Sequence, residues 1–406
     1  MLGKMSIVCR SLVALSSTVL IHGLVFLGVT LVQPSDLFGQ ARAKLDPQRA
    51  KKTFHVSDYV YALDRNSSDI LFINPQTDRI DRTITLSSRS ERLDLVPGTK
   101  FAVATSKNTR KALIVDLESS QIRHVVNFKI APDLVALAAD GSVLAIAEIA
   151  SGALYLFDPY KGMQLAGPLT FSDINDLRFG KKSSRLYIST LAASQLFVLD
   201  LPTGKLLNTI KLPSSSGVSH FSRTPSGRLG VAVMPGPDRP QVVPIDLQLN
   251  TALKNVSVGH PVYRSFVTPS GSHVFLPAKK TGQVSLYSID KHAIVKTLKM
   301  SEPVHMMGPG LLGISMYAAS RSGDRLWQID LESFAVRSTI QLPAKPERLA
   351  VHEGTAQIYL SFQDDSGLAI VDSRFSSKEF NKSRLLIFLE RKPFGIASVG
   401  MLGFCH

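Results

Sequence analysis

The stretch Leu186–Lys205 reads LYISTLAASQLFVLDLPTGK, and its pattern recurs along most of the chain. It holds an apolar strand, a small polar loop, and a second apolar strand that ends at Asp200 before a turn with Pro202 and Gly204. In the eight copies the acidic or amide residue that ends the second strand is Asn74, Asp116, Asp158, Asp200, Asp246, Asp290, Asp330 and Asp372. These positions lie 40 to 46 residues apart. A regular period of about 40 to 45 residues built from strands predicts a β-propeller, in which each repeat is one blade.

The strands of the repeat are dense in apolar residues. Ala112–Val115 and Ala153–Phe157 are continuous apolar runs, which is typical of strands covered on both faces. The acidic residue after the second strand begins a turn, as in Asp200–Lys205, where Gly204 can adopt a positive φ. Because such an acidic residue occurs in almost every copy, we interpret these residues as structural rather than catalytic.

The two ends of the repeat region are out of phase. The first copy begins at Tyr59 with a second-type strand, whereas the segment 393–399 after the last copy matches an innermost strand. We therefore predict an all-β, eight-bladed propeller over residues 59–400, closed by the C-terminal strand, which would hide the sheet edges. Seven blades remain the alternative, because residues 378–392 are less regular. Residues 44–58 would form a linker and residues 401–406 a tail.

The amino terminus contains a membrane-targeting segment. Lys4 and Arg10 precede Leu12–Val32, a run of 21 residues without a charged side chain. This length suits both a signal peptide and an uncleaved signal-anchor helix, so residues 1–43 are assigned to one or the other. Small residues near Ala41 favour cleavage slightly, and residues 12–32 would hold the protein at the membrane if it is not cleaved. Either way the repeats are exported, to a periplasmic or extracellular location.

Charge and cysteine content limit the partners. The net charge of +14 favours acidic partners, either a protein or an anionic small molecule. Nucleic acid is disfavoured, because no dense Lys/Arg run with interleaved aromatic residues occurs. The only cysteines, Cys9 and Cys405, exclude a disulfide framework, and no Cys-x-x-Cys-His motif for covalent haem attachment is present.

The segments Leu186–Ser189, Leu196–Lys205 and Thr224–Gly227 together resemble the YVTN-type propeller repeat. The resemblance extends over residues 59–399. This family includes surface-layer and other secreted propellers, and its repeats are similar to those of the haem-binding propeller of dissimilatory nitrite reductase and of amine dehydrogenase heavy chains. A WD40 propeller is disfavoured, because the single tryptophan, Trp327, is not followed by Asp. The resemblance implies the fold and leaves the function open.

Propellers usually bind ligands at one mouth of the central channel, where the chain enters the innermost strands. Alignment of the copies at this point gives Arg92, Leu134, Asp176, His220, Arg264, His305, Arg348 and Gly395. Guanidinium groups pair bidentately with planar anions, so this mainly cationic set suits a carboxylate, a phosphate or a tetrapyrrole with propionate groups. The alternative is that these side chains bond only to neighbouring loops and waters.

Haem ligation is a separate hypothesis for two of these residues. The nitrite reductase resemblance implies that His220 or His305 could supply an axial imidazole. The attached electron-transfer haem domain of that enzyme has no counterpart in this chain. We therefore predict no metal site and no cofactor, with a haem-type tetrapyrrole as the alternative.

The sequence shows no catalytic constellation. No Gly-x-Ser-x-Gly elbow and no phosphate-binding loop occurs. The leading hypothesis is an exported, non-enzymatic propeller that serves as a ligand-binding or protein-interaction scaffold. The alternative is a tetrapyrrole-binding accessory protein or enzyme of redox-cofactor metabolism. A lactonase-like hydrolase, which would resemble cytosolic propellers, is disfavoured by the export segment.

Overall fold

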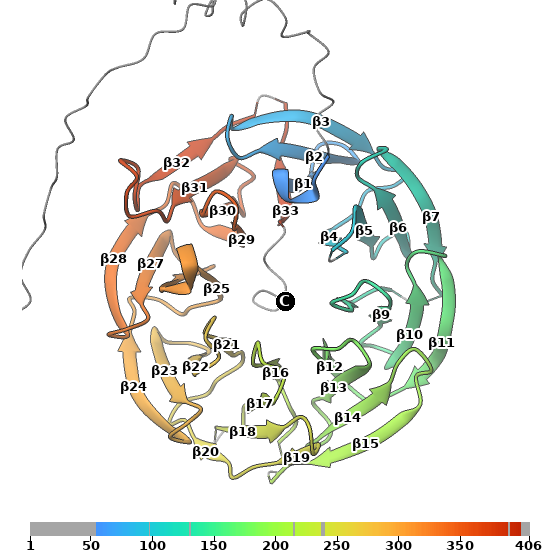
Figure 1. Cartoon of the computed structure of the whole chain (residues 1–406), viewed down its shortest axis with the longest axis vertical. Coiled ribbons are helices and arrows are strands. Elements are labelled where there is room, and N and C mark those ends of the chain that lie inside the picture. Colours follow the sequence, from blue (N-terminus) through green and yellow to red (C-terminus); the bar gives the residue numbers. More distant parts are fainter. Residues whose placement is uncertain are drawn as a thin grey trace, which may run out of the picture. The chain divides into compact units, whose positions relative to one another are not determined.

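The computed structural model describes residues 54–398, except residues 97, 130, 214–215, 237–239 and 389. This part of the chain forms eight antiparallel sheets arranged as blades around a central axis (Figure 1). It contains no α-helix, and two short 3-10 helices, η1 (Val56–Asp58) and η2 (Leu311–Gly313), precede second strands. The predicted all-β propeller with eight blades is confirmed, and the seven-bladed alternative is wrong.

Each blade places its first strand next to the axis and its last strand at the rim. Blades one to four are β33 (Pro393–Ala397), β1 (Val60–Asp64), β2 (Asp69–Asn74) and β3 (Arg79–Thr85); β4 (Arg92–Leu95), β5 (Phe101–Ser106), β6 (Lys111–Asp116) and β7 (Gln121–Asn127); β8 (Leu134–Leu137), β9 (Leu144–Ala147), β10 (Ala153–Asp158) and β11 (Met163–Thr170); β12 (Ile174–Phe179), β13 (Arg185–Thr190), β14 (Gln195–Asp200) and β15 (Leu206–Lys211).

Blades five to eight follow the same order. They are β16 (His220–Arg223), β17 (Leu229–Met234), β18 (Gln241–Asp246) and the split outer pair β19 (Thr251–Ala252) and β20 (Val256–Ser257); β21 (Phe266–Val267), β22 (His273–Pro277), β23 (Gln283–Ser288) and β24 (Ala293–Lys299); β25 (Met306–Pro309), β26 (Ser315–Ala319), β27 (Arg325–Asp330) and β28 (Ala335–Gln341); β29 (Pro346–His352), β30 (Gln357–Phe362), β31 (Leu368–Asp372) and β32 (Ser383–Leu386).

The ring closes as the phase of the repeat predicts. Strand β33 from the carboxyl-terminal end pairs with β1, and Asp64 lies opposite Pro393 in the register. Just before β33, the guanidinium of Arg391 donates to Asp64 Oδ2 over 2.9 Å and also to a carboxylate oxygen of Asp69. These ion pairs hold the last strand onto blade one, because both carboxylates are buried.

Residues that precede Tyr59 in the chain also pack against the propeller. Phe54 and Val56, which the sequence places in the linker, pack against the core between blades one and two. The guanidinium of Arg82 lies 4.8 Å from the ring centre of Phe54 and 4.2 Å from that of Phe72. The predicted segments 1–43 and 401–406 fall outside the described residues. Within the described part, no helix has the length and apolar character needed to cross a membrane.

The strand-end acids stabilise turns, as their periodicity predicts. Asp116 Oδ1 accepts the backbone N–H groups of Glu118 and Ser119, and Asp158 and Asp246 accept the equivalent bonds in their own blades. Equivalent strands of all blades run in the same direction, so the ring has two distinct faces. The first strands start at one face, which we call the mouth face. The hairpins that join first to second strands lie on the opposite face, which we call the hairpin face.

Candidate functional site

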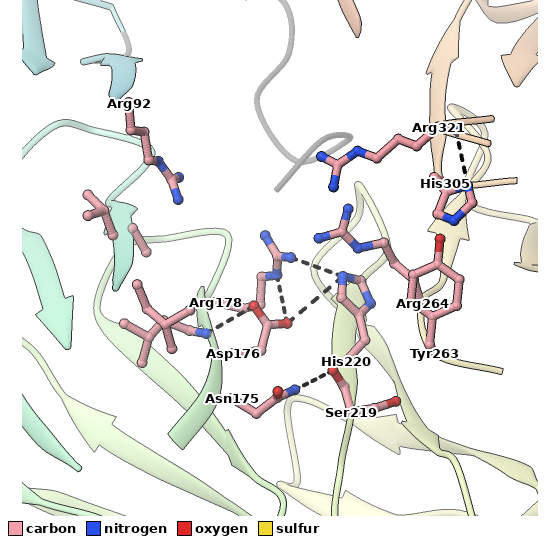
Figure 2. Close-up of a pocket in the computed structure, with 14 residues that line it drawn as sticks. Arg92, Asn175, Asp176, Arg178, Ser219, His220, Tyr263, Arg264, His305 and Arg321 are labelled. Carbon is pink, nitrogen blue, oxygen red and sulfur yellow. Dashed lines mark hydrogen bonds and ion pairs between the residues drawn. The ribbon is translucent and has the colours of Figure 1, made fainter. Parts of the chain in front are cut away.

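The candidate site lies on the mouth face, around the starting ends of the innermost strands (Figure 2). It is a cavity of about 330 Å³, which is within the size range of small-molecule sites. Six consecutive blades, from blade two to blade seven, contribute to its wall. The lining residues are Arg92, Leu134, Val135, Ala136, Asn175, Asp176, Leu177, Arg178, Ser219, His220, Tyr263, Arg264, His305 and Arg321.

The structure brings most of the residues predicted for the mouth to this cavity. Those that line it are Arg92, Asp176, His220, Arg264 and His305, together with the aligned Leu134. Arg348 and the aligned Gly395 are not part of its wall. Arg348 nevertheless lies close enough to interact with the cavity: burial lowers its pKa and the charge of Arg92 lowers it further, while Asp94 and Glu347 oppose this effect. The role of all these residues in binding a ligand remains a prediction.

Several lining residues were not predicted. Arg178 lies two positions after Asp176 on β12, so strand alternation places both side chains on one face, and this signal could have found it. Tyr263 directly precedes the predicted Arg264. Arg321 follows β26 in the hairpin that joins the second and third strands of blade seven. An alignment of the innermost strands cannot identify Arg321, because this residue lies outside those strands and comes near the cavity only in the folded blade.

Arg92 is held by a carboxylate on its own strand. Its Nε donates to Asp94 Oδ2 over 2.6 Å, and its Nη2 donates to Asp94 Oδ1 over 3.0 Å. Burial alone would lower the pKa of Arg92, but the charge and hydrogen bonds of Asp94 raise it. The pair therefore places a permanently charged guanidinium in the wall of the cavity.

A second network joins blades four and five across the mouth. Asp176 Oδ2 accepts the Nε–H of Arg178 over 3.2 Å and the backbone N–H of Phe221 over 3.1 Å. The Nη2 of Arg178 lies 3.0 Å from His220 Nε2 (Figure 2). Burial lowers the pKa of Arg178, and the charge of Arg264 lowers it further, against the opposing effect of Asp176. The network fixes the orientation of Arg178 toward the cavity.

His220 is engaged at both ring nitrogens. Its Nε2 faces Arg178, which can only donate, and its Nδ1 lies 3.0 Å from the hydroxyl oxygen of Ser265. The backbone N–H of Ser265 also donates to Nδ1 over 3.2 Å, so both ring nitrogens face hydrogen-bond donors. The His220 side chain is only 8 % exposed. Metal ligation by Nε2 would therefore require displacement of the Arg178 guanidinium.

His305 presents a donor to the cavity rather than a lone pair. Its Nδ1 accepts the backbone N–H of Arg321 over 3.2 Å, so the proton of the neutral ring is on Nε2. Burial lowers the pKa of His305 and the charges of Arg321 and Arg264 add to this effect, although the carbonyl of Pro303 opposes it. Metal-bound histidines usually donate their second ring N–H. His305 does the reverse, so it suits an anion better than iron.

Two arginines at the mouth have no direct carboxylate partner among the described residues. Arg264 and Arg348 form no hydrogen bond and no ion pair with any residue in the described part of the chain. In Figure 2 the Arg264 side chain extends toward the cavity beside His305. The wall holds four guanidinium groups but a single carboxylate, that of Asp176. The cavity therefore carries an excess of positive charge in a setting partly shielded from water, which strengthens its attraction for anions.

No metal cluster accompanies this charge. Among the residues that the structure describes, no group of three or more His, Cys, Asp and Glu side chains is arranged to hold a metal ion. The chemistry available in the cavity is hydrogen-bond donation and positive charge, from arginines and His305.

Comparisons with known proteins relate the chain to others through its structure. No protein-family model and no curated protein sequence matches it. The solved structure of dihydro-haem d1 dehydrogenase NirN in complex with DHE superposes with a TM-score of 0.69 and 14 % identity, covering 87 % of this chain and 78 % of that one. Hydrazine synthase of Kuenenia stuttgartiensis superposes with a TM-score of 0.56 and 13 % identity, covering 70 % of this chain and 95 % of that one.

At these identities the likeness concerns the fold alone. The assignment to the YVTN-type repeat family stays a prediction, since no family model matches. The chain is thus a β-propeller that shares its architecture with the NirN and hydrazine synthase chains.

Proposed function

We propose that this protein is an exported, non-enzymatic propeller that binds a small molecule with two or more anionic oxygen groups in the mouth of its channel. The observation that carries this proposal is Arg264, a guanidinium at the cavity without a partner among the described residues. A cation in a partly buried site is costly unless something pairs with it. An anionic ligand would supply that partner.

The neighbours of Arg264 support a ligand with more than one anionic group. Arg92 and Arg178 are oriented by carboxylates on their own strands, and Arg321 reaches the same cavity from blade seven. Carboxylates and phosphates match the planar fork of guanidinium, and His305 adds a neutral N–H donor. A single carboxylate would leave part of the positive charge unpaired, whereas a di- or tricarboxylate would not.

A tetrapyrrole is the second candidate. The structure of NirN, which has a similar fold, is a complex with DHE, and the arginines of the mouth could hold the carboxylate groups of such a ligand. The histidines do not fit as axial ligands, because His220 is engaged at both nitrogens and His305 accepts a backbone N–H at Nδ1. A tetrapyrrole here would therefore be held by its carboxylates.

Thermal unfolding with defined probes tests the first candidate. Citrate, succinate and phosphate are added to the purified protein in chloride buffer, and the melting temperature is compared with that of Arg264→Gln. We expect a rise with citrate that exceeds the rise with succinate and is lost in Arg264→Gln. Arg325→Gln, which removes an exposed arginine bonded to Ser301, is the matched control and retains the rise. Equal shifts in both variants, or none with any probe, would overturn the proposal.

Absorbance titration separates the second candidate from the first. Haem is added to micromolar protein, and the Soret region is recorded for the wild type and for Arg264→Gln. A saturable spectrum that weakens in this variant favours carboxylate-held tetrapyrrole binding, and a spectrum equal to that of free haem refutes it. Mass spectrometry of membrane and soluble fractions tests export, because release predicts a mature terminus near residues 42–44.

A further inference from the structure

We propose that the anion bound at the mouth is amphiphilic, with its carboxylate groups at the cations of blades six and seven and an apolar body against blades three and four. This inference rests on the proposed function and adds the chemical class of the ligand to it. It follows from the way in which apolar and cationic side chains are divided around the mouth.

Blade three contributes only apolar side chains to the cavity wall. They are Leu134, Val135 and Ala136, which are consecutive residues of β8. Val135 is buried, whereas Leu134 and Ala136 are half-buried and lie on the same face of the strand. Among the residues aligned at the start of the innermost strands, Leu134 is the only one with a large apolar side chain; the others are Arg92, Asp176, His220, Arg264, His305, Arg348 and Gly395.

The carboxylate next to Leu134 does not change the character of this wall. Asp133 Oδ2 accepts the backbone N–H of Ile149 over 2.9 Å, and its Oδ1 lies 2.6 Å from Lys107 Nζ. Both oxygens are therefore held by loops that surround the mouth. The part of the wall formed by β8 stays neutral and apolar.

A second set of equivalent residues forms the rim of the mouth. In blade seven His305 Nδ1 accepts the backbone N–H of Arg321, just as Asp133 accepts that of Ile149 in blade three. Arg321 and Ile149 thus occupy the same position, two residues after the second strand of their blades. The matching residues of all blades lie 42 or 44 residues apart in the chain and are Arg65, Lys107, Ile149, Leu191, Pro235, Lys279, Arg321 and Gln363.

The rim is divided into an apolar and a cationic part. Ile149 is 46 % exposed and Leu191 is 51 % exposed, on blades three and four, and Pro235 follows on blade five. Blades six, seven, one and two carry cations at this position. In the ring of eight blades, blade three lies opposite blade seven (Figure 1). The apolar wall therefore faces Arg321 and His305 across the mouth.

This division suits a ligand with two chemically different ends. Release of water from apolar surface favours the burial of Leu134 and Ile149 against an apolar group, while the guanidinium groups opposite pair with carboxylates. A ligand without an apolar part, such as citrate, leaves these side chains in water. Small-molecule sites commonly combine an apolar wall with a few polar groups that fix the orientation of the ligand, and the mouth has this arrangement.

Matched dicarboxylates test the inference. Maleate and phthalate both hold two carboxylates in the same cis arrangement, and phthalate adds an aromatic ring. Their dissociation constants are measured by calorimetry in chloride buffer at a pH where both are dianions. We expect the wild type to bind phthalate at least about tenfold more tightly than maleate. Arg264→Gln should weaken the binding of both probes, which would locate them at the mouth.

Two substitutions locate the apolar body. Leu134→Asn should bring the affinities for phthalate and maleate close together, whereas Leu137→Asn, on the same strand but outside the cavity wall, should retain the difference. Naphthalene-2,3-dicarboxylate extends the ring system toward the rim, and Ile149→Gln should weaken its binding by about threefold. Ile149 is exposed, so this variant tests the inference even if Leu134→Asn does not fold.

Equal affinities of the wild type for maleate and phthalate would overturn the inference and leave the proposed function in place. An equal loss of the preference in Leu134→Asn and Leu137→Asn would also overturn it, because the effect would then not come from the cavity wall. If citrate, maleate and phthalate all fail to bind, the proposed function is wrong and the inference is wrong with it.

Discussion

Replacement of Arg264 by Gln is expected to stabilise the ligand-free protein while it removes anion binding. Arg264 shares the cavity with Arg92, Arg178 and Arg321, and their charge is opposed by Asp176 and by Asp94, the partner of Arg92. Two unit charges about 10 Å apart repel by about 1.7 kcal/mol at an effective dielectric constant of about 20. Physiological salt reduces this to about 0.5 kcal/mol for each pair. Three repulsive pairs, with Arg92, Arg178 and Arg321, and two attractive pairs, with Asp176 and Asp94, leave about 0.5 kcal/mol to be gained.

Urea unfolding in chloride buffer measures this gain directly, because both proteins are compared without ligand. A gain of about 0.5 kcal/mol corresponds to a rise of about 1 °C in melting temperature for a domain of this size. With citrate at about 100 times its dissociation constant, the wild type gains about 2.7 kcal/mol and the variant gains little. The order of stabilities therefore reverses when the ligand is added. Such a trade-off is typical of functional sites, where stability is given up for binding.

The reasoning is refuted if Arg264→Gln lowers the unfolding free energy in chloride by about 1 kcal/mol or more. That result would mean that Arg264 holds the fold together. Arg325→Gln again serves as the control, because its exposed side chain bonds only a hydroxyl among the described residues. Its effect is expected to stay within about 0.5 kcal/mol in either buffer.

Three further predictions concern ring closure, pH and the histidine at the mouth. Arg391→Gln leaves the buried carboxylates of Asp64 and Asp69 without their cation, and urea unfolding is expected to show a loss of about 3 kcal/mol; a loss under about 1 kcal/mol would contradict the closing role of the pair. Although burial opposes the effect, hydrogen bonds and nearby charges lower the pKa of Asp116 to about 2, below its ordinary value of 3.8. The stabilisation by the Asp116 carboxylate is therefore present above about pH 4 and is lost as the pH falls toward 2. Between these pH values the unfolding free energy of Asp116→Asn should fall by about 2 kcal/mol less than that of the wild type. An equal fall in both proteins would contradict this role of Asp116. Because burial lowers the pKa of His305, its protonation should not change the affinity for citrate, measured by calorimetry, between about pH 6.5 and 8. His305→Gln keeps a neutral donor, so it should bind citrate about tenfold more tightly than His305→Leu. Equal affinities of the two variants would show that the donor is not used.

Most of the fold could be predicted from the sequence because every blade of a propeller repeats the same pattern of strands and turns. Each blade has the same order of apolar strands, and turns such as that at Asp116 use the same side-chain to backbone bonds. The phase of the ends, with Tyr59 in a second-type strand and Pro393 in a first-type strand, was sufficient to predict the closure. It did not reveal that Phe54 and Val56 already pack on the core, because that contact depends on the space between two blades.

The candidate site could be predicted only in part. Register alone placed Arg92, Asp176 and His220 at the mouth, since the innermost strands start at the same face. It could not reveal that Arg321 reaches the cavity from a hairpin on blade seven. Nor could it reveal which donors face the rings of His220 and His305, because these donors come from other strands and loops.

The sequence by itself therefore predicted the propeller, the closure of the ring and the side of the channel that carries arginines, because period and register are local properties of the chain, while it left seven blades open beside eight. Only the tertiary structure decided which of those arginines are compensated. Arg92 has Asp94 two residues away on its own strand, while Arg264 meets no carboxylate among the described residues of any blade. Charge compensation depends on distances between side chains from different blades, and these distances exist only once the ring has closed.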